Sequence, residues 1–158
     1  MLQSPEQPVQ RHAVMVRWQQ AGLLICGPPG IGKSSLALAI LHQGGQLIAD
    51  DCVDIIRLDA QLIAQCPAAH VGLLHSRELG LLNIPSLFND DAVLAETPID
   101  GIIKLLPEPP GKLEFSQDAS EQILGIEVQV LALSVLNPLS LTERIALWLR
   151  QRPTKNEV

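Results

Sequence analysis

Short apolar stretches separated by polar turns run the length of the chain, a pattern typical of a packed α/β domain. Residues 21–26 (AGLLIC) form an apolar run that suits a buried strand. Residues 34–42 then place Leu36, Ile40 and Leu41 on one stripe of a helix. The pattern therefore predicts a strand followed directly by a helix.

Further predicted strands cover residues 13–18, 46–49, 53–58, 61–66, 72–75, 101–106 and 125–133. Residues 79–84 fit a strand or a loop, and residues 86–91 fit a turn. Residues 106–112 (LPEPPGK) are Pro-rich and fit a surface loop. Ser140, followed three residues later by Glu143, predicts the capping box of a final helix.

Residues 27–34, between the first strand and the helix, read GPPGIGKS and match the phosphate-binding loop GxxxxGK[ST]. Glycines let successive backbone N–H groups surround phosphate oxygens, and the helix N-terminus favours an anion. Lys33 is predicted to reach the β and γ phosphates, and Ser34 to bind Mg²⁺. An ordinary Gly/Pro turn is the alternative, but the flanking strand and helix favour phosphate binding. The predicted ligand is a nucleoside triphosphate, held by Gly27, Pro28, Pro29, Gly30, Ile31, Gly32, Lys33, Ser34 and Ser35.

The composition limits the size, the kinds of binding partner and the cellular location that are expected of the chain. With 158 residues, 47% of them hydrophobic, the chain suits one domain over residues 1–158. Its net charge of −6 argues against sequence-independent nucleic-acid binding, and its apolar runs are too short to span a bilayer. Three scattered cysteines favour a reducing cytoplasm. Cys66, His70 and His75 lack a fourth zinc ligand and the spacing of a known finger.

Two adjacent acids, Asp50 and Asp51, follow Lys33 by only 17 residues at the end of the strand at 46–49. This short spacing implies that the strand after the helix returns to the phosphate loop. A solvated turn is the alternative. Beside a phosphate loop, however, one carboxylate is needed to position Mg²⁺ and another to accept the proton of an attacking hydroxyl.

These residues together resemble the catalytic domain of HPr kinase/phosphorylase. The resemblance comprises His12 at a strand start, Gly27 15 residues later, the loop, and LIADD at 47–51. It continues through residues 66–93, which resemble the family signature LExRGLGI(I/L)NV. Later parts of the resemblance are 98–105 and 123–135.

The resemblance implies an α/β, P-loop-containing core like that of phosphoenolpyruvate carboxykinase, with a mixed sheet and a C-terminal helix. It implies a Mg²⁺-dependent serine kinase that takes phosphate from ATP or pyrophosphate, acts on HPr or a related phosphocarrier, and in many members also runs phosphorolysis. Many members are hexamers, so a homo-oligomer is expected. Carried over by position, Asp50 is the base, Asp51 joins Ser34 at the metal, and His12 and Arg77 are catalytic-site residues.

The chain departs from the family pattern at two signature positions, where His75 replaces the glutamate and Glu78 replaces the first glycine. Glu78 is a candidate to replace the lost acid. Residues 136–144 (LNPLSLTER) stand in place of an Arg-rich segment, and the N-terminal domain of longer members is absent from this sequence. Three hypotheses follow: the carrier kinase, an ATP-binding regulatory module that has lost transfer, and a small-molecule kinase on the same scaffold.

Overall fold

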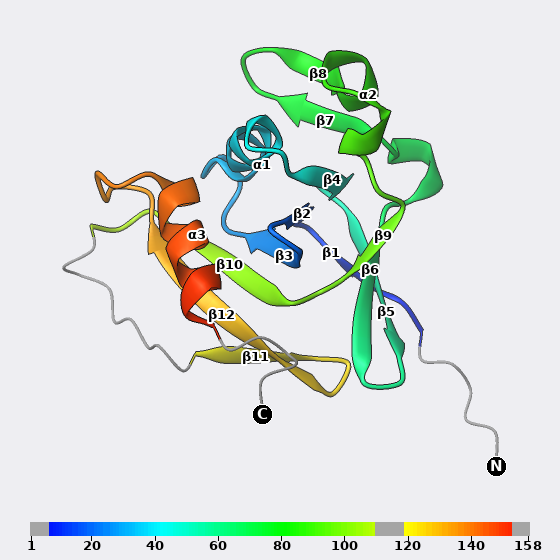
Figure 1. The fold of residues 1–158 in the computed structure, drawn as a ribbon. Coiled ribbons are helices and arrows are strands. Elements are labelled where there is room, and N and C mark those ends of the chain that lie inside the picture. Colours follow the sequence, from blue (N-terminus) through cyan, green and yellow to red (C-terminus); the bar gives the residue numbers. More distant parts are fainter. Residues whose placement is uncertain (1–6, 110–118, 153–158) are drawn as a thin grey trace.

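A computed structural model describes residues 7–109 and 119–152, and within these ranges the strands form three sheets (Figure 1). The larger sheet has the order β11 (Ser120–Ile123), β12 (Ile126–Ser134), β10 (Gly101–Leu106), β3 (Ala21–Cys26), β2 (Val14–Trp18), β4 (Gln46–Ala49). The second has the order β1 (Val9–Arg11), β5 (Val53–Leu58), β6 (Gln61–Gln65), β9 (Glu96–Pro98). A hairpin is formed by β7 (Leu73–Ser76) and β8 (Gly80–Asn83). The helices are α1 (Lys33–His42), α2 (Ile84–Leu87) and α3 (Leu141–Gln151), with short 3₁₀ turns η1 (Ala68–His70) and η2 (Asp90–Ala92).

The directions of the central strands bring two loops to the same edge of the larger sheet. β10 and β12 run parallel to each other and β10 is parallel to β3, whereas β2 is antiparallel to both β3 and β4. β4 therefore runs in the same direction as β3. In the register, Val14 of β2 lies opposite Ile25 and Met15 lies opposite Ala49. The ends of β3 and β4 therefore lie at the same edge of the sheet, one on each side of the start of β2.

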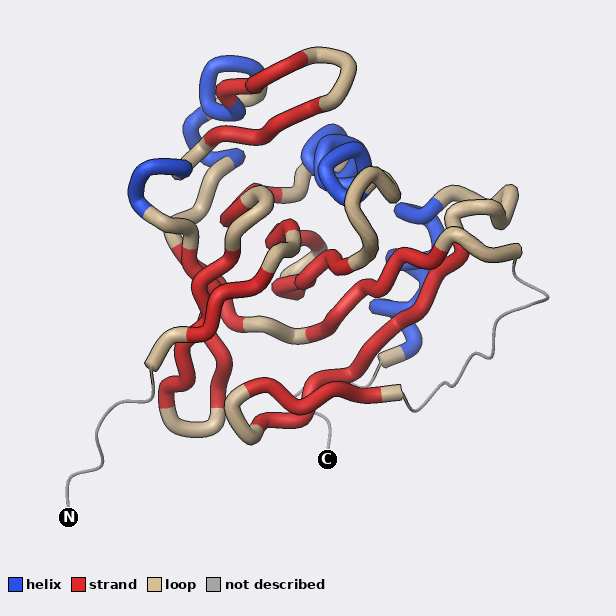
Figure 2. Tube along the Cα trace, turned by 180° about the vertical axis from the view of Figure 1, so that it is seen from behind, coloured by secondary structure: helices blue, strands red, loops and turns tan. Residues whose placement is uncertain are grey.

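Both faces of the larger sheet are covered, which explains why its central strands are apolar at nearly every position. On one face, Leu23 and Ile25 pack in a core with α1, α3 and α2. On the other face, Leu24 packs in a core with residues of β5 and β6. Figures 1 and 2 show the hairpin of β7 and β8, with α2, beside α1 and β4, and the hairpin of β5 and β6 extending away from the larger sheet.

The predicted α/β class, with a mixed sheet and a C-terminal helix, is confirmed. Residues 79–84, which fitted a strand or a loop, contain β8. The turn predicted at 86–91 is confirmed only in part: residues 86–87 belong to α2, residues 88–89 connect it to the next element, and residues 90–91 begin the 3₁₀ turn η2. The Asn83 side chain caps α2 by accepting from the Ser86 N–H, and Pro85 lies in the first turn, where its fixed φ suits a helix.

The final helix begins after Ser140, whose Oγ accepts a hydrogen bond from the Glu143 N–H at 3.1 Å. This is the first half of the predicted capping box. The predicted loop at 106–112 lies partly outside the described residues. Among those described, no helix is both long and apolar enough to cross a membrane.

Candidate active site

The phosphate-loop sequence forms the connection between β3 and α1. Gly32 is the N-cap of α1 with φ of 116°, a left-handed conformation that favours glycine, and its C=O accepts from the Leu36 N–H at 2.9 Å. The Lys33 Nζ donates to the carbonyl oxygens of Gly27 at 2.8 Å and Pro28 at 3.2 Å. The ammonium group of Lys33 is therefore folded back onto the start of the phosphate loop.

Asp50 is held from two sides immediately after β4. Its Oδ1 accepts from Ser34 Oγ at 2.9 Å, and its Oδ2 accepts from the His75 N–H at 2.8 Å. The start of α1, the end of β4 and the strand β7 therefore meet at one half-buried carboxylate. The 17-residue spacing predicted this return to the loop. The contact from β7 could not be anticipated, because it uses a backbone group.

The backbone at Asp51 turns sharply, with φ of 70° and a hydrogen bond from the Cys52 N–H to the Asp50 carbonyl at 2.8 Å. This turn leaves the Asp51 side chain exposed beside the held Asp50. Mg²⁺ is usually bound through one or two carboxylates together with phosphate oxygens. The Ser34 hydroxyl and the two aspartates fit such a site, and no larger His, Cys, Asp and Glu cluster for a metal occurs among the described residues.

Arg77, on the turn between β7 and β8, lies against the phosphate loop. A Cβ added to Gly30 would be 3.3 Å from one terminal nitrogen of its guanidinium group. The positive φ of 80° at Gly30 also favours glycine. Arg77 therefore provides a positive charge at the loop, although it follows Lys33 by 44 residues in the sequence.

The other sequence-predicted residues lie at the margin of this arrangement. His12 is exposed between β1 and β2, close in sequence to the part of β2 that faces the ends of β3 and β4. Glu78 is exposed at the turn between β7 and β8, where it follows Arg77. The side chain of His75 is exposed as well, and the contact of this residue with Asp50 is made by its backbone N–H.

An ion pair that the sequence did not predict lies behind the loop. The Arg11 guanidinium pairs with the Glu121 carboxylate, with one Nη2 to Oε1 distance of 3.0 Å, and Nη2 is 3.8 Å from Cys26 Sγ. The hydrogen bond to Glu121 raises the pKa of Arg11, and burial raises the pKa of the Cys26 thiol. The two partners are 110 positions apart, so neither local pattern nor spacing reveals the pair.

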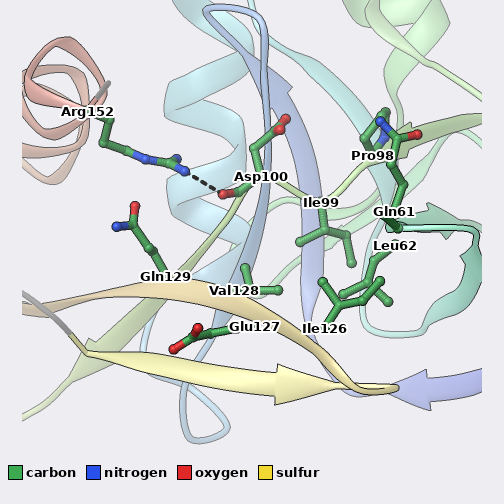
Figure 3. Close-up of a pocket in the computed structure, with 11 residues that line it drawn as sticks. Gln61, Leu62, Pro98, Ile99, Asp100, Ile126, Glu127, Val128, Gln129 and Arg152 are labelled. Atoms are coloured by element: carbon green, nitrogen blue, oxygen red, sulfur yellow. Dashed lines mark hydrogen bonds between the residues drawn. The ribbon is translucent and has the colours of Figure 1, made fainter. Parts of the chain in front are cut away.

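A separate pocket of about 220 Å³ lies at the opposite edge of the larger sheet, where β10 begins (Figure 3). There the Arg152 Nη2 donates to the Asp100 carbonyl at 2.8 Å, and the guanidinium stacks 4.6 Å from the ring centre of Trp148. None of its lining residues belongs to the phosphate loop. The pocket is therefore remote from the candidate chemistry.

Comparisons with known proteins find relatives that match most of the chain. The family model described as HPr Serine kinase C-terminal domain matches residues 5–154. The HPr kinase/phosphorylase of Clostridium acetobutylicum is 34% identical over 128 residues, which cover 78% of this chain and 42% of that protein. The protein of that name from Clostridium tetani is 42% identical over 116 residues, covering 73% of this chain and 36% of that protein. The chain thus spans about two fifths of the length of these curated relatives.

A solved structure, the Hpr(Ser) kinase/phosphatase from Coxiella burnetii, superimposes with a TM-score of 0.82. It is 31% identical in sequence, and the match covers 90% of this chain and 88% of that chain. The similarity therefore covers nearly the whole fold.

Proposed function

Because the chain belongs to the HPr serine kinase C-terminal domain family, we propose that it transfers phosphate from ATP to a serine hydroxyl of HPr or a related phosphocarrier. The observation that carries the proposal is the 2.9 Å hydrogen bond between Ser34 Oγ and Asp50 Oδ1. It joins the hydroxyl proposed to bind Mg²⁺ with the carboxylate proposed as the base. A single domain over residues 1–158 is part of the same proposal.

In this proposal the loop amides and Lys33 hold the phosphates, with Lys33 leaving the carbonyls of Gly27 and Pro28 to reach the β and γ groups. Ser34 and Asp51 are the residues that would hold Mg²⁺. When bound, the ion would neutralise charge on the phosphate oxygens. Arg77, lying over Gly30, adds a second positive charge near the transferring group.

Asp50 receives the proton of the attacking hydroxyl. As the serine oxygen forms its bond to the γ-phosphorus, the bond from that phosphorus to the bridging oxygen breaks, ADP leaves, and the proton moves to the Asp50 carboxylate. The reverse reaction would use the protonated Asp50 as an acid. His12, exposed near this edge, is assigned to the catalytic site only through its matching position in the family.

The test measures ³²P transfer from labelled ATP to purified HPr, with pyrophosphate as an alternative donor. Asp50→Asn is expected to lower the transfer rate by about 10² to 10⁴-fold, because general base catalysis typically contributes that much. The matched control, Asp59→Asn, changes an exposed acid on the turn between β5 and β6 and should keep the wild-type rate.

A chain that binds ATP but transfers phosphate to no carrier would refute the kinase proposal. That result would favour the regulatory module, for which the replacement of the signature glutamate by His75 is the motivating observation. Release of ADP with a metabolite acceptor would instead favour the small-molecule kinase. The expected homo-oligomer, hexameric in many family members, and the cytoplasmic location stay predictions; light scattering of the purified chain checks the first.

A further inference from the structure

A pocket of about 430 Å³ opens beside the phosphate loop, between α1 and the start of α3. Its volume lies within the range of roughly 300–1,000 Å³ that small-molecule sites occupy. The residues that line it are apolar or carry hydroxyl groups, with Ile31, Ser35 and Ala39 on one wall and Val135, Leu141 and Thr142 on the other. The loop and the pocket therefore form one continuous surface.

The hydrogen bond between Ser34 and Asp50 indicates how a triphosphate would be oriented along the loop. Ser34 is hydrogen-bonded to Asp50, so the β and γ phosphates, with their metal, belong on the Asp50 side. The lining of the pocket includes Ser35 but neither Asp50 nor Arg77. We therefore expect the α-phosphate end on the side of this pocket, next to Ser35.

We propose that this pocket takes the nucleoside part of the triphosphate, its base and ribose. The inference rests on the proposed function and extends it by assigning a nucleoside subsite. A flat base would pack against the apolar side chains of Ile31, Leu36 and Leu141, and the hydroxyls of Ser35 and Thr142 would meet polar groups of the ribose or base. No carboxylate or amide side chain is among the lining residues, so no such side chain is available in the pocket to select one base over another.

The wall formed by residues 134–140 is held in place by the protein itself. The Arg144 guanidinium donates to the carbonyl oxygens of Ser134 and Leu139, each at 3.0 Å. Ser134 Oγ also accepts from the Leu136 N–H at 3.1 Å. The arginine that remains in the segment 136–144 is thus used to shape this wall, and burial lowers the pKa of its guanidinium. A rigid wall reduces the entropy cost of ligand binding.

Calorimetry with two probes separates the nucleoside from the phosphates. Mg²⁺ with the non-hydrolysable ATP analogue AMP-PNP reports both parts, and Mg²⁺ with tripolyphosphate reports the phosphate loop alone. The wild-type chain should bind AMP-PNP at least tenfold more tightly than tripolyphosphate. Ala39→Phe on α1 and Thr142→Phe on α3 fill the pocket from opposite walls, and each should remove most of that difference while changing tripolyphosphate affinity by less than twofold.

Leu147→Phe is the matched control, because Leu147 is exposed on α3 outside the pocket. It should bind both probes as the wild type does. Retained tripolyphosphate binding also shows that each filled variant is folded. If both filled variants bind AMP-PNP normally, or if the wild type does not distinguish the probes, the nucleoside subsite is refuted while the phosphate loop stands. If the wild type binds neither probe, the proposed function fails as well.

Discussion

The hydrogen bond between Ser34 and Asp50 makes a quantitative prediction about stability. It connects the first turn of α1 to the end of β4 at 2.9 Å, and both residues are half-buried. A hydrogen bond to a charged group contributes about 1.5–3 kcal/mol, and partial exposure reduces this value towards about 1 kcal/mol. Ser34→Ala and Asp50→Ala should therefore be coupled in their effects on the free energy of unfolding.

A double-mutant cycle measures this coupling by urea unfolding, monitored by circular dichroism and extrapolated to water. The double variant should lose about 1 kcal/mol less than the sum of the two single losses. The cycle also cancels the effect that Asp50→Ala alone has on the His75 N–H, which loses its acceptor in both arms.

Ser86→Ala provides the control for this cycle, because Ser86 is exposed on α2. Combined with Asp50→Ala, it should be additive within about 0.5 kcal/mol. Additivity within about 0.3 kcal/mol for Ser34 and Asp50 themselves would refute the reasoning. The hydroxyl and carboxylate would then not interact in solution, and the shared site for metal and base would lose its structural support.

Three further predictions concern the signature, a thiol and the core. Glu78→Gln should weaken the Mg²⁺ dependence of AMP-PNP binding if this acid replaces the lost glutamate; an unchanged Mg²⁺ titration contradicts that role. Burial, with a smaller effect from Asp54, raises the pKa of the Cys66 thiol to about 11. In a variant with serine at the other two cysteines, the alkylation rate of the folded chain should therefore keep rising above pH 9, whereas the rate of the urea-unfolded chain should level off there. Leu24→Ala, at a fully buried position of β3, should lower the free energy of unfolding by about 2–5 kcal/mol in urea titrations, and a loss below about 1 kcal/mol contradicts the packing.

The strands and helices that could be predicted from the sequence are those marked by a pattern within their own residues. Residues 46–49, 53–58 and 101–106 coincide with strands because an apolar run or an alternating pattern marks them. The short strands β1, β9 and β11 escaped prediction. Each has three or four residues, and their extended conformation depends on partners elsewhere in the chain, as in the pairing of Val9 with Ile55.

The same distinction applies to the candidate site. One octapeptide predicted a phosphate loop between β3 and α1, and the spacing to Asp50 indicated that β4 returns to it, as the Ser34–Asp50 hydrogen bond confirms. The position of Arg77 over Gly30 depends on how the hairpin of β7 and β8 packs against α1, which no local pattern encodes. The pairing of Arg11 with Glu121 likewise follows only from the folded arrangement.

The hydrogen bond from β7 to Asp50 explains what the replacement of the signature glutamate by His75 changes and what it leaves intact. The strand holds Asp50 through the His75 N–H, a backbone group that histidine and glutamate both have. Replacing the signature glutamate therefore removes a carboxylate without removing this anchor. Asp50 keeps its second contact through Ser34, so the orientation of the proposed base does not depend on the side chain at position 75. The departure should accordingly affect metal binding more than the position of the base, which is why the Mg²⁺ dependence and the rate of phosphate transfer need to be measured separately.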